Sequence, residues 1–271
     1  MTAQNQDPVR ASYEAWWSRV RMALDDEIAA GETNLSRLLC KIYAKTVGER
    51  HINESISVLW GTEVPVPYLP ANQIIRGWIA DTVIANATYA DAILETGSGW
   101  GYNLFNIWLR GGPDVPYHAF EYTEAGRESA HAIHKATKGG PKLHVHPFNY
   151  YEPDLTPVNG RYEHVLVYSS HSIEQIGTLP AAFIEALLSV AKKVTCIHFE
   201  PVGWQFAEQT NQPIHNYGQL AYSEKHGYNK NLWKLLNDYQ NRGRLHIDET
   251  SVETMCVKTY NGTSVIRWHA A

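Results

Sequence analysis

From residue 92 onward, short apolar segments recur at intervals of about 20 to 30 residues, and this spacing constrains the fold more than any other feature. The segments are residues 92–94, 117–120, 143–146, 164–167 and 194–199. Helical stretches separate them, which is typical of repeated β-α units that build a parallel sheet. Near the end, residues 245–258 and 264–269 flank Asn261 and Gly262, the strongest short hairpin signal in the chain. We therefore expect the last two strands to be antiparallel.

The first third of the chain has a different pattern. Residues 12–30 and 33–47 each carry apolar side chains at helical spacing. Prolines interrupt residues 64–70, which cannot continue a helix, and a third segment with helical spacing follows at 71–87. These patterns predict roughly ninety helical residues before any strand begins.

The change of pattern divides the chain into two parts. Residues 1–70 are expected to form an N-terminal helical cap or lid, and residues 71–271 an α/β domain. A loop-rich insertion at 201–229, rich in Gln, Asn, His and Tyr, interrupts the second part. With 271 residues, 44% of them apolar, the chain is long enough to bury one large core.

The composition argues against several classes of partner. The 23 basic and 28 acidic side chains give a formal net charge of −5, so no basic field is available for nucleic acid or an anionic membrane. A polar N-terminus and the lack of an apolar run of about eighteen residues argue against secretion and membrane spanning, and we expect a cytoplasmic protein. Three cysteines without CxxC spacing are expected as reduced, buried thiols: Cys40, Cys196 and Cys256.

The first strand of the α/β domain ends in a loop with alternating glycines. Residues 93–101 read ILETGSGWG, and a helix is expected from Tyr102. Glycines here allow a sharp turn and a close approach of the backbone to a ligand, and the N–H groups at the start of the helix face that ligand. The nicotinamide fingerprint GxGxxG is not met, because Tyr102 stands where its third glycine belongs. The loop is therefore predicted to bind a different cofactor.

This ExGxGxG pattern resembles motif I of the class I S-adenosylmethionine-dependent methyltransferases. The resemblance covers about residues 71–271, including the terminal hairpin, which matches the family's reversed last strand. It implies a Rossmann-like, doubly wound α/β fold with a mostly parallel seven-stranded sheet and an antiparallel C-terminal hairpin strand. It also implies S-adenosyl-L-methionine as the cofactor.

The resemblance assigns roles to residues after three strands. In the family, the glycine loop cradles the amino-acid end of the cofactor, and Glu121 stands where the family has the acidic residue that accepts hydrogen bonds from both ribose hydroxyls. Asn149 stands where the family usually has an Asp at the adenine amino group, a departure from the commonest form. The predicted cofactor-binding set is Glu95, Gly97, Gly99, Gly101, Glu121, Phe148, Asn149, Tyr150 and Ser169.

Acceptor chemistry is expected after the fourth and fifth strands, because ligands of open α/β sheets bind at the carboxyl ends of the strands. His171 is the candidate general base, since an imidazole can take a proton from an attacking hydroxyl or ammonium; alternatively it caps the following turn. Glu174 and Glu200 are predicted to position the acceptor, and Glu200 either orients the imidazole, binds a cationic acceptor or is an ion-paired loop residue.

Two further alternatives stay open. His171, Glu174, His198 and Glu200 together form an oxygen and nitrogen ligand set, but no HxxxH or DxD spacing supports it, so no metal is predicted. The N-terminal aromatic residues fit either a core or a lid over a pocket: Tyr13, Trp16, Trp17, Trp60 and Tyr68.

The sequence therefore predicts an enzyme that transfers a methyl group to an oxygen or nitrogen of a small polar metabolite. A non-catalytic cofactor-binding or assembly module and a NAD-dependent oxidoreductase are the alternatives. Methylation of protein or nucleic acid ranks lower, because no basic groove is apparent. The identity of the acceptor and the oligomeric state, including a homodimer, stay open.

Overall fold

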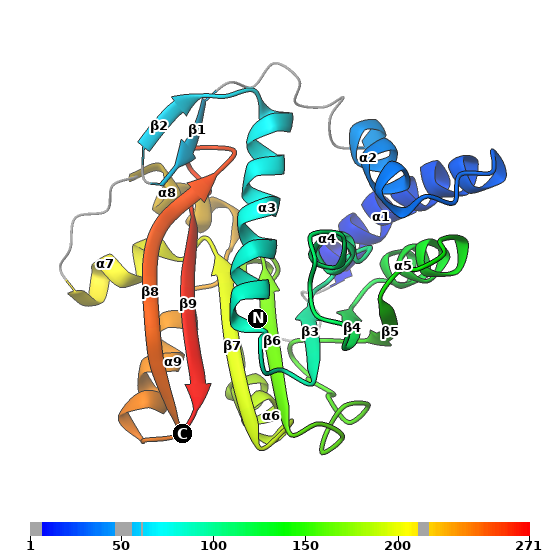
Figure 1. Ribbon diagram of the computed structural model, residues 1–271. Helices are drawn as coiled ribbons and strands as arrows, with labels where there is room; N and C mark the ends of the chain where they lie inside the picture. Colours follow the sequence, from blue (N-terminus) through cyan, green and yellow to red (C-terminus); the bar gives the residue numbers. More distant parts are fainter. Residues whose placement is uncertain (1–6, 47–55, 61, 211–216) are drawn as a thin grey trace.

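A mixed β-sheet runs through the centre of the molecule in the computed structural model, which describes residues 7–46, 56–60, 62–210 and 217–271 (Figure 1). Its order is β2-β1-β8-β9-β7-β6-β3-β4-β5. The strands are β1 (Ile56–Leu59), β2 (Thr62–Pro65), β3 (Ala92–Thr96), β4 (Pro116–Glu121), β5 (Lys142–Pro147), β6 (His164–Ser170), β7 (Lys193–Glu200), β8 (Leu245–Cys256) and β9 (Thr263–Ala270). Strands β3 to β7 pair in parallel, and β9 pairs antiparallel to both β7 and β8.

Helices cover both faces of this sheet (Figure 1). They are α1 (Asp7–Ala29), α2 (Leu35–Thr46), α3 (Tyr68–Asn86), α4 (Tyr102–Leu109), α5 (Glu124–Ala136), the 3₁₀ turn η3 (Ile173–Gln175), α6 (Ala181–Ser189), α7 (Gly203–Thr210), α8 (Tyr217–His226) and α9 (Leu232–Asn241). Buried side chains of α1 to α5 form one core with the sheet, and those of α6 and α9 form another. The architecture is therefore a doubly wound α/β fold.

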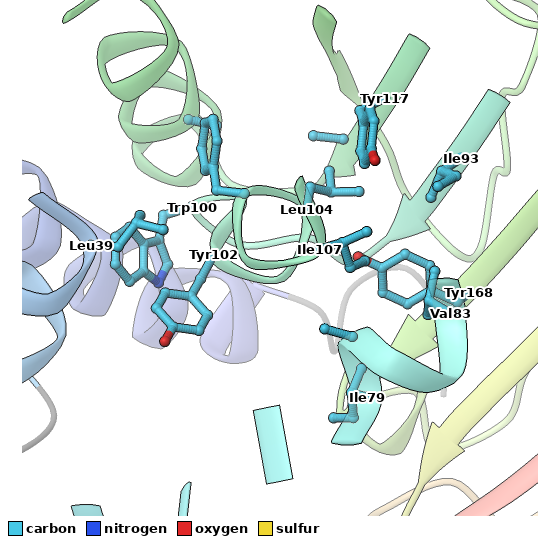
Figure 2. Close-up of a cluster of buried hydrophobic side chains, with 14 of the residues drawn as sticks. Leu39, Ile79, Val83, Ile93, Trp100, Tyr102, Leu104, Ile107, Tyr117 and Tyr168 are labelled. Atoms are coloured by element: carbon cyan, nitrogen blue, oxygen red, sulfur yellow. The ribbon is translucent and has the colours of Figure 1, made fainter. Parts of the chain in front are cut away.

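The two cores follow from the two-residue period of the strands. Ile93 of β3 packs in the core with α3 and α4, whereas its neighbour Leu94 packs in the core with α6 and α9. Because successive strand side chains point to opposite faces, a strand buried on both faces carries a continuous apolar run. Figure 2 shows the first core, where Ile79 and Val83 of α3 lie near Ile107 of α4 and Tyr168 of β6.

The sequence prediction of the sheet is correct in its centre and wrong at one edge. All five predicted parallel strands and the terminal hairpin are present. In the described residues the sheet has nine strands rather than seven, because β1 and β2 form a hairpin in which β1 pairs with β8 through Val58 and Leu59. The expectation of ninety helical residues before any strand is therefore wrong. The sequence did not predict this hairpin, because proline disfavours a strand. Pro65 is tolerated in β2 because β2 is an edge strand.

Two smaller expectations also change. The segment predicted as a loop-rich insertion, 201–229, contains the helices α7 and α8, while residues 211–216 lie outside the described residues. All three cysteines are free, but Cys40 is exposed rather than buried. Within the described parts of the chain, no helix combines the length and the apolar character that a membrane crossing requires.

Candidate functional site

A cavity of about 460 Å³ opens at the carboxyl ends of the parallel strands. This volume lies in the range typical of small-molecule sites, and the position is where open α/β sheets bind ligands. Residues that follow β3, β4, β5 and β6 line it, together with side chains from α1, α3, α8 and the turn between β8 and β9. Of the predicted site residues, those that line it are Gly97, Gly99, Glu121, Asn149, Tyr150, His171 and Glu174.

The glycine loop has the left-handed backbone that its sequence implies. The φ angles of Gly97, Gly99 and Gly101 are 71°, 54° and 79°. A Cβ atom on Gly97 would lie 2.3 Å from the Cβ of Ser172, and one on Gly99 would lie 2.7 Å from the ring of Trp17. Close packing against these two side chains therefore requires glycine, in addition to the φ angles.

The main-chain amides of this loop were expected to face a ligand, but in the structure they form hydrogen bonds within the protein. The amides of Gly97 and Ser98 donate to the carbonyl oxygen of Phe120, at 2.8 and 3.1 Å. The amide of Gly99 donates to the Glu121 carboxylate (2.7 Å), and that of Gly101 to the carbonyl of Ser98 (2.9 Å). These four amides already have acceptors within the protein, so the loop offers a ligand mainly a close approach of its backbone.

Glu121, at the end of β4, joins the glycine loop to the start of α5. Its Oε2 accepts from the Gly99 amide, and its Oε1 accepts from the amide and hydroxyl of Thr123, at 2.9 and 2.6 Å. The carboxyl group is buried, and this burial raises its pKa, which the hydrogen bonds from Thr123 and Gly99 oppose. Glu121 is thus a fixed acceptor at the cavity wall.

The loop after β5 places only part of its predicted set in the cavity. The Asn149 Oδ1 accepts from the Tyr151 amide (3.0 Å), which fixes the turn. The Tyr150 hydroxyl donates to the Thr96 carbonyl (2.9 Å) and lies 2.7 Å from the Ser172 hydroxyl. Phe148 packs instead in the core with Tyr150 and does not line the cavity.

His171 lies where the chain leaves β6, with both ring nitrogens occupied. Its Nδ1 is 3.0 Å from Glu174 Oε2, and its Nε2 is 2.7 Å from the hydroxyl of Thr263, the first residue of β9. Burial opposes the charged imidazolium, but the Glu174 and Glu200 carboxylates outweigh it and raise the pKa of His171. A φ of 51° is rare for a residue with a Cβ atom, and such strain concentrates at functional sites.

Glu200 was predicted to position the acceptor, but its side chain lies elsewhere. It does not line the cavity: its Oε1 accepts from the amides of Ser172 and Ile173, and its Oε2 accepts from the Glu174 amide, at 3.1 to 3.2 Å. Burial, followed by the Glu174 charge, raises the pKa of Glu200 to about 7. Glu200 therefore holds the turn that carries His171 and Glu174.

Ser169 and His198 lie in the core. The Ser169 hydroxyl is 3.0 Å from His198 Nδ1, and the Trp268 indole donates to His198 Nε2 (3.1 Å). Both side chains are buried, and burial lowers the pKa of His198 to about 3. Within the ranges that the structure describes, no three His, Cys, Asp or Glu side chains are grouped as ligands of one metal ion.

Glu95 is fully buried beneath the glycine loop and does not line the cavity. Its Oε1 accepts from the Asn103 side-chain amide (2.6 Å), and Asn103 Oδ1 in turn accepts from Arg76 of α3 (2.7 Å). Burial raises the pKa of Glu95 to about 8, against the Asn103 hydrogen bond. Arg76 and Asn103 were not among the predicted site residues, since neither belongs to a motif.

Helix α1 lies against the glycine loop, where Trp17 contacts Gly99. Tyr13 and Trp17 line the cavity, and the guanidinium of Arg10 lies 4.9 Å from the centre of the Tyr122 ring. The Glu14 carboxylate accepts from the amides of Glu124 and Ala125, the first residues of α5, at 2.9 and 2.7 Å. A carboxylate at a helix N-terminus satisfies unpaired N–H groups and the helix dipole, so Glu14 fastens α1 over the cavity.

Among the comparisons with known proteins, only the comparison with solved structures finds similar proteins. No family model matches the chain, and no curated protein matches it in sequence. Similar solved structures include magnesium protoporphyrin IX methyltransferase from Synechocystis PCC 6803 with bound SAH, which is 14% identical over 74% of this chain and 84% of that one (TM-score 0.47). A SAM dependent methyltransferase from Aquifex aeolicus is 12% identical over 75% of this chain and 98% of that one (TM-score 0.46).

A putative Zn-dependent alcohol dehydrogenase from Rhodobacter sphaeroides is also similar, with 10% identity over 71% of this chain and 89% of that one (TM-score 0.43). The similar solved structures therefore include both methyltransferases and a putative alcohol dehydrogenase. At such identities, the similarity identifies neither a reaction nor a ligand for this chain.

Proposed function

We propose that this chain is an S-adenosylmethionine-dependent methyltransferase that acts on an oxygen or nitrogen of a small polar metabolite. One observation carries the proposal: the left-handed Gly97 and Gly99 open onto a cavity of about 460 Å³, and the Glu121 carboxylate of the next strand is hydrogen-bonded to Gly99 in its wall. Strand β9 adds support, because its reversed direction is the one that the motif resemblance implies.

The acceptor capacity of Glu121 fits a ribose. A carboxylate has about four acceptor sites, and the Gly99 amide and the two Thr123 groups use three of them. One site is left for a ribose hydroxyl. A second becomes available when the Thr123 hydroxyl, a rotatable donor, turns away from Glu121. Asn149 lines the same cavity, and it stands where the motif resemblance places the residue at the adenine amino group.

The acceptor half of the proposed site centres on His171. The bound cofactor supplies an electrophilic methyl group, so the protein needs to align the acceptor and remove its proton. Glu174 at Nδ1 holds the ring with Nε2 as the basic nitrogen, facing Thr263. An acceptor hydroxyl or ammonium that takes the place of Thr263 at Nε2 would give its proton to the imidazole. Of the three residues predicted as catalytic, Glu200 acts in this proposal through the turn that it holds.

Helix α1 contributes by excluding water. Trp17 packs on Gly99, and Tyr13 lines the cavity with its hydroxyl among acidic groups: burial, and then Glu174, Glu121 and Glu200, raise its pKa. Closing an active site strengthens the electrostatic interactions inside it and prevents hydrolysis of reactive groups. The helix would therefore open to admit the cofactor and close before methyl transfer.

Isotope transfer tests the proposal directly. The purified protein is incubated with S-adenosylmethionine labelled in its methyl group and with a fractionated pool of small metabolites. We expect label in one polar fraction, with formation of S-adenosylhomocysteine. Calorimetry with S-adenosylmethionine and NADH provides the control. Binding of NADH alone would point to an oxidoreductase, and binding of S-adenosylmethionine without any product would point to a non-catalytic module.

A further inference from the structure

Glu253 is a buried acid that the proposed reaction does not use. It lies on β8 where the pairing with β9 shifts its register, between Ser251 and Met255. Its φ of 47° is a left-handed angle, uncommon for a residue with a Cβ atom. Glu253 is 5% exposed, and its Oε1 is buried without a hydrogen-bond partner among the described residues. Buried polar atoms are rarely left unpaired, and backbone strain concentrates at functional positions.

The Glu253 side chain lies between the start of α7 and the turn that joins β8 to β9. A Cβ atom added to Gly203, the first residue of α7, would lie 2.7 Å from the Cγ of Glu253. One added to Gly262 in the turn would lie 3.0 Å from its Cβ. Glycine at both positions therefore leaves the room that Glu253 occupies.

Gln219 of α8 enters the same space with a fixed orientation. Its Nε2 donates to the Gly262 carbonyl (2.8 Å), and its Oε1 accepts from the Trp204 amide (3.3 Å). These two bonds fix which atom of the amide group is the oxygen. The Oε1 atoms of Gln219 and Glu253 both lie 3.0 Å from the position of a Cβ on Gly203. The two acceptor oxygens are therefore close neighbours.

The protonation state of Glu253 decides whether this arrangement is favourable. An ionised carboxylate only accepts hydrogen bonds, so it would face the Gln219 oxygen without a donor, whereas the neutral acid has an O–H that can donate to that oxygen. Burial raises the pKa of Glu253 to about 7. The neutral acid therefore persists at pH values where an exposed Glu is ionised.

The groups around Glu253 leave it as the titrating group of this layer. Gly203, Gln219 and Gly262, which pack on it from α7, α8 and the turn, do not titrate. Cys256 on the same strand is affected by the charge of Glu253, but burial is the largest cause that raises the pKa of this thiol to about 11. Cys256 stays neutral between pH 6 and pH 8.

We propose that Glu253 is a pH-dependent switch: the neutral acid holds α7, α8 and the β8–β9 turn together, and its ionisation releases them. The turn carries Tyr260 and Thr263, which line the cavity, and the Tyr260 ring lies 4.5 Å from that of Tyr222 on α8. The Thr263 hydroxyl lies 2.7 Å from His171 Nε2. Release of the turn would free this nitrogen for an acceptor; that consequence rests on the proposed function, whereas the opening itself does not.

Amide hydrogen exchange of the full chain measures the opening without any turnover. The probes are the amide of Trp204, which donates to Gln219, and that of Glu253, which donates to Ser264 Oγ at 3.0 Å. We expect both protection factors, corrected for the intrinsic pH dependence of exchange, to fall about tenfold from pH 6 to pH 8. This fall follows from a pKa of about 7 in the closed state and the ordinary 4.5 after release. The amides of β3, four strands away in the sheet, should keep their protection.

Three variants separate Glu253 from other titrating groups. Glu253→Gln keeps the size of the side chain, cannot ionise and has an N–H for the Gln219 oxygen, so protection at Trp204 should be as high at pH 8 as at pH 6. Glu253→Asp keeps an acid, so the pH dependence should persist, and this variant carries the comparison if the glutamine variant does not fold. Glu249→Gln is the matched control, because Glu249 is an exposed residue of the same strand that accepts from Arg267 (3.3 Å). It should show the parental fall.

A tenfold fall that persists in Glu253→Gln would overturn the inference, because another group would then control the opening. Constant protection in the parent chain or in Glu253→Asp would overturn it as well, since the acid would not be linked to the opening. A parent chain that opens with rising pH but transfers no labelled methyl group would support the switch and reject the proposed function. The two failures are therefore distinguishable.

Discussion

The two halves of the cavity are built in different ways. Around the glycine loop, the bonds join neighbouring β-α units: Gly99 and Glu121 are 22 residues apart. Around His171, one partner, Glu174, is three residues away, and the other, Thr263, is 92 residues away on the reversed strand β9. The glycine-loop half is marked by a motif in the sequence, whereas the His171 half is not. The following variants test whether the two halves also serve separate purposes.

The largest effect is expected from His171→Ala in the acceptor half. Removal of a general base typically costs about 10²- to 10⁴-fold in rate. We expect turnover to fall by this amount while the affinity for S-adenosylhomocysteine stays unchanged, because the glycine half of the cavity is intact. Steady-state kinetics and calorimetry measure the two quantities. Equal turnover by variant and parent would remove His171 from the mechanism.

A change in the glycine half should have the opposite signature. In Gly97→Ala, the new Cβ would lie 2.3 Å from Ser172 Cβ at a φ of 71°. We expect a loss of about 2–4 kcal/mol in the free energy of unfolding, from backbone strain and overpacking, and a loss of cofactor affinity. Denaturant unfolding and calorimetry provide the measurements.

Gly160→Ala is the matched control, because Gly160 has a φ of 68° and no atom within 4 Å of the added Cβ. It should cost about 1–2 kcal/mol from backbone strain alone, with unchanged cofactor affinity. If Gly97→Ala and Gly160→Ala cost the same, the contact with Ser172 does not constrain the loop.

A smaller effect is expected on the pH dependence. The Glu174 and Glu200 carboxylates raise the pKa of His171 above its usual 6.5 despite burial, and the base acts only when deprotonated. Turnover should therefore rise with pH through this raised pKa. In Glu174→Gln, the loss of the negative charge lowers the pKa, so the rise should move about one pH unit lower. The pH profile of kcat/KM measures this, and an unmoved midpoint would exclude control by Glu174.

The smallest effect is expected at the lid. Glu14→Gln removes the charge that α1 places at the start of α5, which should cost about 1 kcal/mol in the free energy of unfolding. Amide hydrogen exchange at Glu124 and Ala125, which donate to Glu14, should become faster. Asp238→Asn, which removes only a surface pair with Lys234, serves as the control. Unchanged exchange at both amides would show that Glu14 does not fasten α1.

The sequence prediction was accurate where the signal is periodic or contiguous. The parallel strands, the hairpin at Asn261 and Gly262, and the glycine loop all follow from local spacing. It was inaccurate where short-range preference and tertiary pairing disagree. β1 and β2 lie next to and within a proline-containing stretch, and they form strands because β1 pairs with the edge of β8 and β2 pairs with β1.

The predicted site divides in the same way. Gly97, Gly99 and Glu121 lie at the cavity as expected, because the carboxyl ends of adjacent parallel strands meet at one edge of the sheet. Glu200 is the last residue of β7, and Ser169 is one residue before the end of β6. Their side chains nevertheless form hydrogen bonds within the protein. Strand position predicts which level of the sheet a residue occupies, but not whether its side chain meets a ligand or a backbone amide.

By itself, the sequence determined the β-α repeat, the reversed terminal strand and the loop of alternating glycines, because each depends on residues close together in the chain. Only the tertiary structure decided that α1 covers this loop, that Thr263 faces His171 and that Arg76 enters the cavity. The physical reason is that these contacts depend on how helices and strands distant in sequence pack to bury apolar surface. Such packing has no fixed spacing along the chain, so no local pattern records it.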